Sequence, residues 1–179
     1  MNALISFYDH LTDRIDRAAP LILPTMSRLV FAAVLLWYFW ASALTKFDGL
    51  LTPSSGAYAQ IFPRAFEAAG YDVDQFGLWQ ELVVLAGGYG EIILPLLIVI
   101  GLLTRLAAVG MIGFIVVQSL TDIIGHGADD ATIGAWFDRV SDALILDQRA
   151  LWILPLVVLF AQGAGPLSVD ALLRRLRRK

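Results

Sequence analysis

The chain has 179 residues, of which 58% are hydrophobic and 16% charged, and its formal net charge is −3. Soluble domains typically carry about 25% charged residues, so this composition indicates an integral membrane protein, which we treat as one domain over residues 1–179. The chain contains no cysteine. This excludes disulfides, thiolate metal sites, iron–sulfur clusters, thioether-linked haem and thiol chemistry by the chain itself.

The first residues predict a helix that lies in the membrane interface. Over residues 1–19 apolar side chains recur every three or four positions, while aspartates and arginines occupy the other face. The apolar positions are Leu4, Phe7, Tyr8, Leu11, Ile15 and Ala18. We expect Pro20 and Pro24 to break this helix from the first membrane span, which covers approximately residues 25–45.

Three further apolar runs predict membrane spans at approximately residues 82–103, 106–124 and 146–164. A helix over the 22 residues 82–103 is roughly 33 Å long, against a hydrocarbon core of about 30 Å. The next run follows at once, so a tight turn at Thr104-Arg105 joins two antiparallel helices.

Two long polar segments, residues 46–81 and 125–145, form the outer loops. Alanines and aromatic residues at helical spacing in the first loop predict one or two short helices on the surface. Beyond the last span, Ser168 can cap a final amphipathic helix. This helix closes with a basic cluster suited to anionic lipid, which comprises Arg174, Arg175, Arg177, Arg178 and Lys179.

The distribution of positive charge predicts the orientation. With four spans, both termini and the 104–105 turn share one side, which carries nine lysines and arginines against four on the other. An excess of these residues marks the cytoplasmic side. The predicted fold is therefore an all-α membrane protein, a four-transmembrane-helix bundle with amphipathic interfacial helices at both termini. We place it in the inner (plasma) membrane of a bacterial cell with both termini cytoplasmic (N-in/C-in).

One carboxylate stands near the middle of a predicted span. Glu91 is the tenth residue of 82–103, where a charge costs several kcal/mol unless it is paired, protonated or wetted. Gly87 and Gly88 share its helix face and let a neighbouring helix approach, so Glu91 points into the bundle. Two interpretations stay open: a group that exchanges protons or hydrogen bonds in a ligand pocket, and a glutamate that only fixes helix packing.

Other polar and aromatic residues lie in the same outer half of the spans. They are Trp37, Trp40, Ser42, Lys46, Gln118 and Asp122. Four helices could turn the polar members toward one pocket with Glu91. Interhelical bonding is the simpler interpretation of Gln118 and Asp122, and Lys46 either snorkels or reaches toward Glu81 or Asp122.

Charged residues at the other end have simpler expected roles. Arg28 can snorkel to the headgroups, and Arg105 acts as a topology determinant.

His10 and His126 lie on opposite sides, which argues against a haem held by two histidines. His126 with Asp129 and Asp130 is only a weak metal signal, so we assign no metal site. No nucleotide-binding glycine motif is present and no nucleic-acid partner is expected.

Three motifs resemble those of a known family. They are Trp40-Ala41-Ser42-Ala43-Leu44-Thr45-Lys46, Gly101-Leu102-Leu103-Thr104-Arg105-Leu106-Ala107-Ala108 and Gly163-Ala164-Gly165-Pro166-Leu167-Ser168-Val169-Asp170. With a membrane glutamate in a glycine-rich second span, they resemble the DoxX family over most of residues 25–172. Lys46, Glu91, Thr104 and Arg105 match its motif positions, whereas the long outer loops depart from its shorter members.

The resemblance implies a small inner-membrane protein with a redox-linked role. Some DoxX-like proteins resemble the membrane subunit of thiosulfate:quinone oxidoreductase, and others accompany superoxide dismutase and sulfurtransferase or enzymes of metal handling. The first hypothesis is a quinone-linked oxidoreductase subunit. In it Glu91 handles a proton, Trp37 or Trp40 packs on the quinone ring, and electrons come from a partner or a bound cofactor.

The alternative is a non-catalytic membrane scaffold or a small-solute carrier. Under either hypothesis the partners are membrane lipids and a protein bound through the outer loops, and a homo-oligomer stays open.

Overall fold

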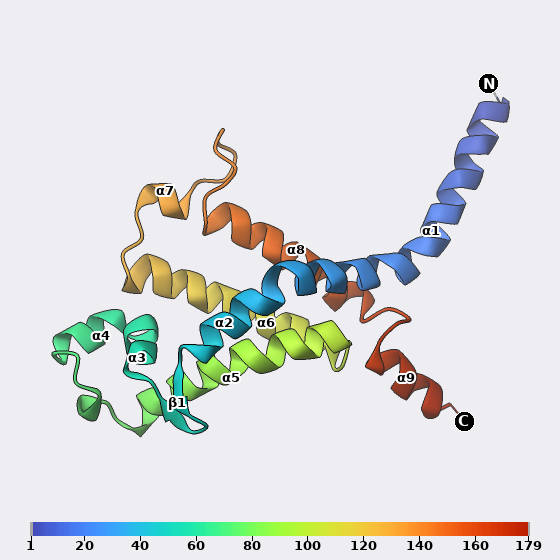
Figure 1. Ribbon diagram of the computed structural model, residues 1–179. Coiled ribbons are helices and arrows are strands. Elements are labelled where there is room, and N and C mark those ends of the chain that lie inside the picture. Colours follow the sequence, from blue (N-terminus) through green and yellow to red (C-terminus); the bar gives the residue numbers. More distant parts are fainter. Residues whose placement is uncertain (1, 179) are drawn as a thin grey trace.

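The computed structural model describes residues 2–178, and almost all of its regular structure is helical. The helices of the bundle are α1 (Asn2–Phe31), the π-helical turn η1 (Ala32–Leu36), α2 (Trp37–Leu44), α5 (Leu78–Ile100), α6 (Thr104–Leu120), the π-helical turn η3 (Thr121–Gly125) and α8 (Leu146–Gln162). The peripheral elements are β1 (Phe47–Gly49), β2 (Thr52–Pro53), α3 (Ser55–Ile61), α4 (Pro63–Ala68), the 3₁₀ turn η2 (Val73–Gln75), α7 (Asp130–Ile133) and α9 (Val169–Leu176). Figure 1 shows their arrangement.

Three helical runs are long and apolar enough to cross a membrane, namely Ala3–Leu44, Leu78–Ile100 and Thr104–Gly125. The protein is therefore an all-α membrane protein. The fourth predicted span corresponds to α8, whose 17 residues give about 25 Å of helix, slightly less than the hydrocarbon thickness. α8 packs against α1 and α6. Its crossing of the membrane, and the orientation of the bundle, stay predictions.

The prediction that Pro20 and Pro24 break the first helix is wrong. Both prolines lie inside α1, which continues through η1 into α2. Figure 1 shows instead a bend in α1, so that its N-terminal limb projects away from the bundle. A proline removes one helical hydrogen bond and pushes the helix off its axis, but the remaining bonds suffice to keep it helical.

One hydrophobic core joins the long helices. The first run contributes Phe31, Leu35 and Phe39, α5 contributes Ile98, α6 contributes Ala107, Ala108, Met111 and Ile115, and α8 contributes Leu156 and Leu159. The small residues Ala107 and Ala108 are fully or almost fully buried, which lets neighbouring backbones approach α6 closely.

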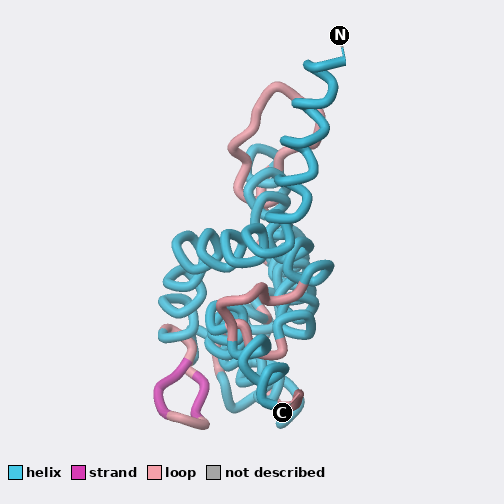
Figure 2. Tube along the Cα trace, turned by 90° about the vertical axis from the view of Figure 1, so that its right-hand side faces the viewer, coloured by secondary structure: helices cyan, strands magenta, loops and turns pink. Residues whose placement is uncertain are grey.

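The two ends of this bundle differ. One, the loop end, carries β1, β2, α3 and α4 beside the ends of α2, α5 and α6 (Figure 1). Figure 2 shows the β1–β2 hairpin, drawn in magenta, projecting from the helices. Two short helices, α3 and α4, lie between residues 46 and 81, where one or two were predicted, and they form a second small core with α5 from Ala57, Tyr58, Phe66 and Val84. The other, the turn end, carries the α5–α6 connection and α9.

The α5–α6 turn is formed by residues 101–103, not by Thr104-Arg105 as predicted. Gly101 (φ 72°) and Leu103 (φ 48°) take left-handed conformations, and Thr104 already belongs to α6. The glycine ends α5 as a left-handed C-cap. A Cβ atom on Gly101 would lie 2.5 Å from Ser168 Cβ, so α9 approaches this turn closely.

Gly101→Ala is expected to destabilise the protein. Both the left-handed backbone and the contact with Ser168 oppose a side chain here, and together they are expected to cost about 2–4 kcal/mol of unfolding free energy. Gly113→Ala is the matched control, because nothing lies within 4 Å of the Cβ position at Gly113. Thermal unfolding in detergent measures both, and equal midpoints for the two variants would contradict the close contact.

Arg28 does not snorkel toward headgroups; it binds backbone carbonyls at the turn end. Its guanidinium donates to Ile98 O at 3.1 Å and to Val99 O, which are carbonyls at the C-terminal end of α5. It also donates to Ala164 O at 3.1 Å and to Leu167 O, in the segment that leads to α9. The half-buried Arg28 thereby joins three parts of the chain, namely α1, the C-terminal end of α5 and the segment before α9.

Arg105 also caps a helix, in addition to any effect on topology. It donates from Nη2 to Ala161 O at 3.1 Å, near the C-terminal end of α8.

Asp170 binds the same turn from the other side. Its carboxylate accepts hydrogen bonds from Leu103 N (2.9 Å), Thr104 N (3.0 Å) and Thr104 Oγ1 (2.8 Å), at the N-terminus of α6. Burial raises the pKa of Asp170, but the hydrogen bonds from Thr104 and Leu103 outweigh this and leave the pKa below the ordinary carboxyl value of 3.8. Two of the three motifs noted in the sequence therefore meet in one contact.

Asp170→Asn is expected to change how stability responds to acid. A carboxylate with a lowered folded-state pKa contributes stability that is present above the unfolded-state pKa and is lost as the pH falls through the folded-state pKa. The wild type should therefore lose stability below about pH 4, and Asp170→Asn should start less stable at neutral pH and lose less on acidification. Unfolding midpoints between neutral pH and pH 3 measure this, with exposed Asp138→Asn as the control. If the unfolding midpoints of Asp170→Asn and Asp138→Asn fall equally with pH, the lowered pKa of Asp170 does not contribute to stability.

Candidate ligand pocket at the loop end

A cavity of about 320 Å³ lies between α2, α5 and α6 at the loop end. Its polar lining includes Tyr38, Ser42, Lys46, Glu91, Gln118 and Asp122. Its apolar lining includes Ile61, Val83, Phe114 and Val117. The volume lies at the lower end of the range for small-molecule sites. The structure thus brings Glu91 and four of the polar candidates from the sequence into one pocket.

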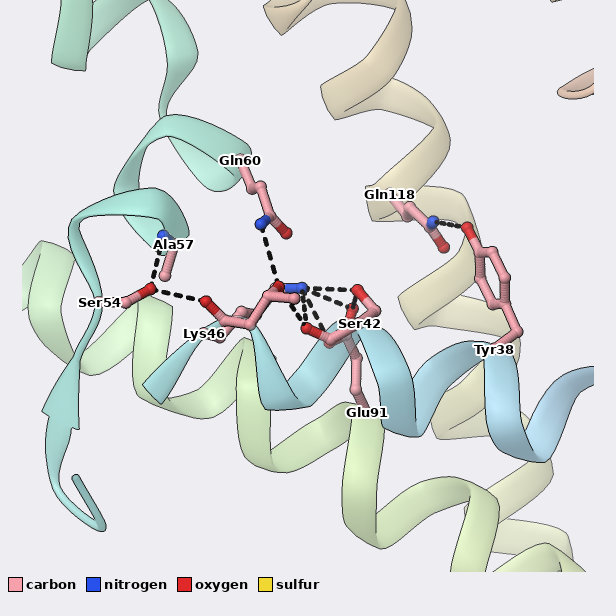
Figure 3. A network of polar contacts seen from close by, with 9 residues as sticks. Tyr38, Ser42, Lys46, Ser54, Ala57, Gln60, Glu91 and Gln118 are labelled. Atoms are coloured by element: carbon pink, nitrogen blue, oxygen red, sulfur yellow. Dashed lines mark hydrogen bonds and ion pairs between the residues drawn. The ribbon is translucent and has the colours of Figure 1, made fainter. Parts of the chain in front are cut away.

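The central contact is between Lys46 and Glu91. Lys46 Nζ lies 2.9 Å from Glu91 Oε2 and 3.1 Å from Oε1, and each residue is only 4% exposed. Ser42 Oγ accepts from Lys46 Nζ at 2.8 Å and donates to Glu91 Oε1 at 3.1 Å (Figure 3). Lys46 therefore pairs with Glu91, and neither with Glu81 nor with Asp122 as the sequence suggested.

The end of α2 and the start of α3 place Lys46 in this position. α2 ends at Leu44, and the backbone N–H of Lys46 still donates to Ala43 O at 2.9 Å, so the chain turns Lys46 back toward Ser42. Ser54 caps α3 by accepting from Ala57 N at 3.2 Å, and its Oγ donates to Thr45 O at 2.7 Å (Figure 3). This hydrogen bond holds α3 over the pocket.

Two glycines of α5 make room for residues of the loop end. A Cβ on Gly88 would lie 2.5 Å from the ring of Phe47, and one on Gly87 would lie 3.2 Å from Ile61 Cδ1. The sequence predicted a neighbouring helix on this face. At Gly87 that neighbour is the Ile61 side chain of α3, whereas at Gly88 the Phe47 ring of β1 takes the space, and both cover the face of α5 that carries Glu91.

A second ion pair borders the same pocket. Arg149, in the first turn of α8, pairs with Asp122 and donates to Ser119 Oγ at 2.9 Å. Arg149 is only 7% exposed, and its guanidinium lies 5.9 Å from the ring centroid of Trp152. Sequence reasoning counted Arg149 only as an outer charge. A signal was available, since Arg149, Trp152 and Leu156 recur at helical spacing on the buried face of α8.

Gln118 faces Tyr38 across the pocket. Its Nε2 atom donates to the Tyr38 hydroxyl at 3.0 Å (Figure 3). Its Oε1 atom is buried and has no hydrogen-bond partner among the described residues. Buried polar atoms in native proteins usually have a partner, so this oxygen leaves an acceptor for a bound molecule or water.

The two tryptophans assigned to the ring of a ligand do not line the pocket. Trp37 is 68% exposed, and Trp40 donates from its indole nitrogen to Ile92 O at 3.2 Å. The π-helical turn η1 precedes both and changes the face that each residue of α2 presents. Tyr38 and Phe114 are the aromatic residues of the lining instead.

His126 does not gather acidic residues around it. Its Nε2 lies 3.0 Å from Gln60 O, and Asp129 caps α7 by accepting from Thr132 N at 2.7 Å. Within residues 2–178 no three histidine, aspartate or glutamate side chains lie close enough together to hold a metal ion.

Comparison with known proteins identifies the family. The family model named DoxX matches residues 25–122, which is more than half of the chain. The chain belongs to the DoxX family. The matched segment contains the Lys46–Glu91 pair, Gln118 and Asp122, whereas Arg149 and Asp170 lie beyond it.

One curated relative of this DoxX protein covers most of both chains. It comes from Haemophilus influenzae (strain ATCC 51907 / DSM 11121 / KW20 / Rd), carries the name "Uncharacterized protein", and is 28% identical over 159 residues. The alignment covers 84% of this chain and 85% of the relative. No solved structure matches.

Proposed function

We propose that this DoxX protein binds a quinone in the loop-end pocket and works as the membrane subunit of a quinone-linked oxidoreductase, together with a redox partner protein. The observation that carries the proposal is the buried Lys46–Ser42–Glu91 cluster beside a cavity that is otherwise partly apolar. A buried ion pair costs more to desolvate than an apolar substitute of the same shape, so packing alone gives it little reason to lie here.

The lining suits a ring that carries oxygen atoms. Lys46 and Ser42 present donors on the α2 side, and Gln118 presents a free acceptor on the α6 side. Phe114 and Val117 supply apolar surface between them. A quinone carbonyl can accept from Lys46, and the hydroxyl of the reduced form can donate to Gln118 Oε1. A quinone accepts two electrons and two protons, and the partner protein supplies the electrons.

The side chains of the pocket hold and pass protons. Lys46 Nζ contacts both carboxylate oxygens of Glu91 and the Ser42 hydroxyl. A proton that Lys46 gives up can therefore be replaced through Glu91 or Ser42 without moving a backbone atom. Asp122, held by Arg149, lies in the wall of the same pocket near the exposed His126, which offers an exchange route to water.

The orientation follows from the positive residues that are free to face water. Lys46 and Arg149 are buried in ion pairs, and the half-buried Arg28 is bound to backbone carbonyls. Without these three, the turn side retains eight lysines and arginines and the loop side two, namely Arg64 and Arg139. We therefore place four spans, including α8, in a bacterial inner membrane with both termini cytoplasmic and the pocket near the outer face.

Thermal unfolding with a short-chain quinone tests the function. A ligand at about 100 times its dissociation constant stabilises the folded state by about 2.7 kcal/mol, so the midpoint of the wild type should rise. Val117→Trp fills the pocket without touching its charges and should abolish the rise. Val109→Trp, exposed on α6 outside the pocket, should retain it. No rise in the wild type would favour a membrane scaffold or a small-solute carrier, and an equal rise in both variants would place the quinone elsewhere.

A further inference from the structure

α9 is an amphipathic helix whose two faces are cleanly divided. Leu172, Leu173 and Leu176 are 55%, 40% and 59% exposed, and at 100° per residue they fall on one side of the helix. Arg174 lies opposite these leucines and Arg175 beside it in the last turn of α9, and Arg177 and Arg178 follow directly after the helix. None of these arginines forms an ion pair among the described residues.

The start of α9 is fixed to the ends of two membrane-spanning helices. Asp170 accepts from Leu103 N and Thr104 N at the start of α6, and its own N–H donates to Gly101 O at 2.9 Å at the end of α5. Figure 1 shows α9 beside this turn, at the opposite end of the bundle from α3 and α4. α9 therefore begins beside the ends of α5 and α6, two helices that are long and apolar enough to cross a membrane.

We propose that α9 lies in the membrane interface and binds the headgroups of anionic phospholipids. At this level the leucine face meets the upper acyl chains, and the arginine face meets the phosphate layer. Guanidinium groups bind phosphate oxygens in pairs of hydrogen bonds, so the four arginines in and just after the last turn of α9 select lipids with a net negative charge. A soluble acidic partner would account for the arginines but would leave the leucines in water.

The absence of cysteine gives a direct test on the full chain. Leu176→Cys introduces a single thiol on the apolar face, which can carry an environment-sensitive fluorophore in lipid nanodiscs. A nitroxide on the upper acyl chain of the lipids quenches the fluorophore only when α9 lies in the interface. We expect quenching to be at least about two-fold stronger with one-third phosphatidylglycerol than with phosphatidylcholine alone. The difference should disappear at about 0.5 M salt, where charges are screened within a few ångströms.

Paired variants separate the arginine face from net charge. Arg174→Gln/Arg178→Gln should lose most of the dependence on anionic lipid. Arg64→Gln/Arg139→Gln removes the same charge at the loop end and should keep it. Equal quenching in the two lipid mixtures, or an equal loss in the two double variants, would overturn the proposal. A fluorophore quenched only by a water-soluble reagent would also overturn it, and would point to a soluble acidic partner.

Discussion

Glu91→Leu is expected to lower the free energy of unfolding by about 3–5 kcal/mol, because it leaves the Lys46 ammonium buried without a counter-charge. Lys46 is 4% exposed, and its remaining polar contacts are with Ser42, whose hydroxyl and carbonyl oxygens accept from Nζ at 2.8 Å and 3.4 Å. Reversible unfolding in mixed detergent micelles measures the loss. Glu81→Leu, on the same helix and outside any ion pair among the described residues, is the matched control.

The double variant Lys46→Met/Glu91→Leu separates packing from ligand binding. Replacing both members of a buried ion pair by apolar residues of similar size is often neutral, so the double variant should recover most of the stability. It should nevertheless fail to bind quinone, because Lys46, the donor to the quinone carbonyl, is gone. A double variant as unstable as Glu91→Leu would show that the pair holds the bundle together by more than its charges.

Arg28→Met is expected to cost at least about 3 kcal/mol, because hydrogen bonds to charged groups each contribute about 1.5–3 kcal/mol and Arg28 makes four of them. The loss should fall on the turn end, where α5, the 163–167 segment and α9 meet. Hydrogen exchange should therefore rise at residues 98–104 and 164–172 before it rises in the pocket.

Arg28→Lys tests whether geometry or charge matters. A single ammonium cannot reach all four carbonyls as a planar guanidinium does. The unfolding free energy of Arg28→Lys should therefore lie between those of the wild type and Arg28→Met. Arg64→Met, exposed at the loop end, controls for loss of charge. If Arg28→Met unfolds at the same midpoint as Arg64→Met, the contacts with Ile98, Val99, Ala164 and Leu167 contribute little.

The long apolar helices could be predicted because hydropathy and length are sufficient to recognise a helix that can cross a bilayer. The α5–α6 hairpin follows from two apolar runs with almost no residues between them. The prediction for Pro20 and Pro24 is wrong because it applies the behaviour of proline in water. In water, backbone groups freed by a proline can bond to solvent, so the helix readily ends. In a membrane they have no such partners, so the chain stays helical and bends.

The depth of the polar residues could also be predicted, but their partners could not. Counting residues from the span ends placed Ser42, Glu91 and Gln118 in the outer half of the bundle, and the structure places them around one cavity. Partner choice depends on helix rotation, and the π-helical turns η1 and η3 shift that rotation without a sequence signal. For this reason the sequence predicts that Lys46 snorkels or reaches toward Glu81 or Asp122, and it gives no pairing of Asp122 with Arg149.

The contacts of the turn end required long-range information. Arg28 and Ala164 are separated by most of the chain, and no local pattern joins them. The sequence did show that the 101–108 and 163–170 segments carry motifs. The structure adds the physical reason, since Asp170 caps α6 and Arg28 binds Ala164 O and Leu167 O of the second segment together with the end of α5 just before the first.

Quantifying the quinone that co-purifies with the protein from its own membranes tests the central claim most directly. After gentle solubilisation and organic extraction, the wild type should carry about one quinone per chain, as expected for a single well-formed pocket. Val117→Trp, which fills the pocket, should carry almost none, and Val109→Trp should match the wild type. Wild-type protein free of quinone, or equal amounts in Val117→Trp and the wild type, would contradict the assignment of this pocket as a quinone site.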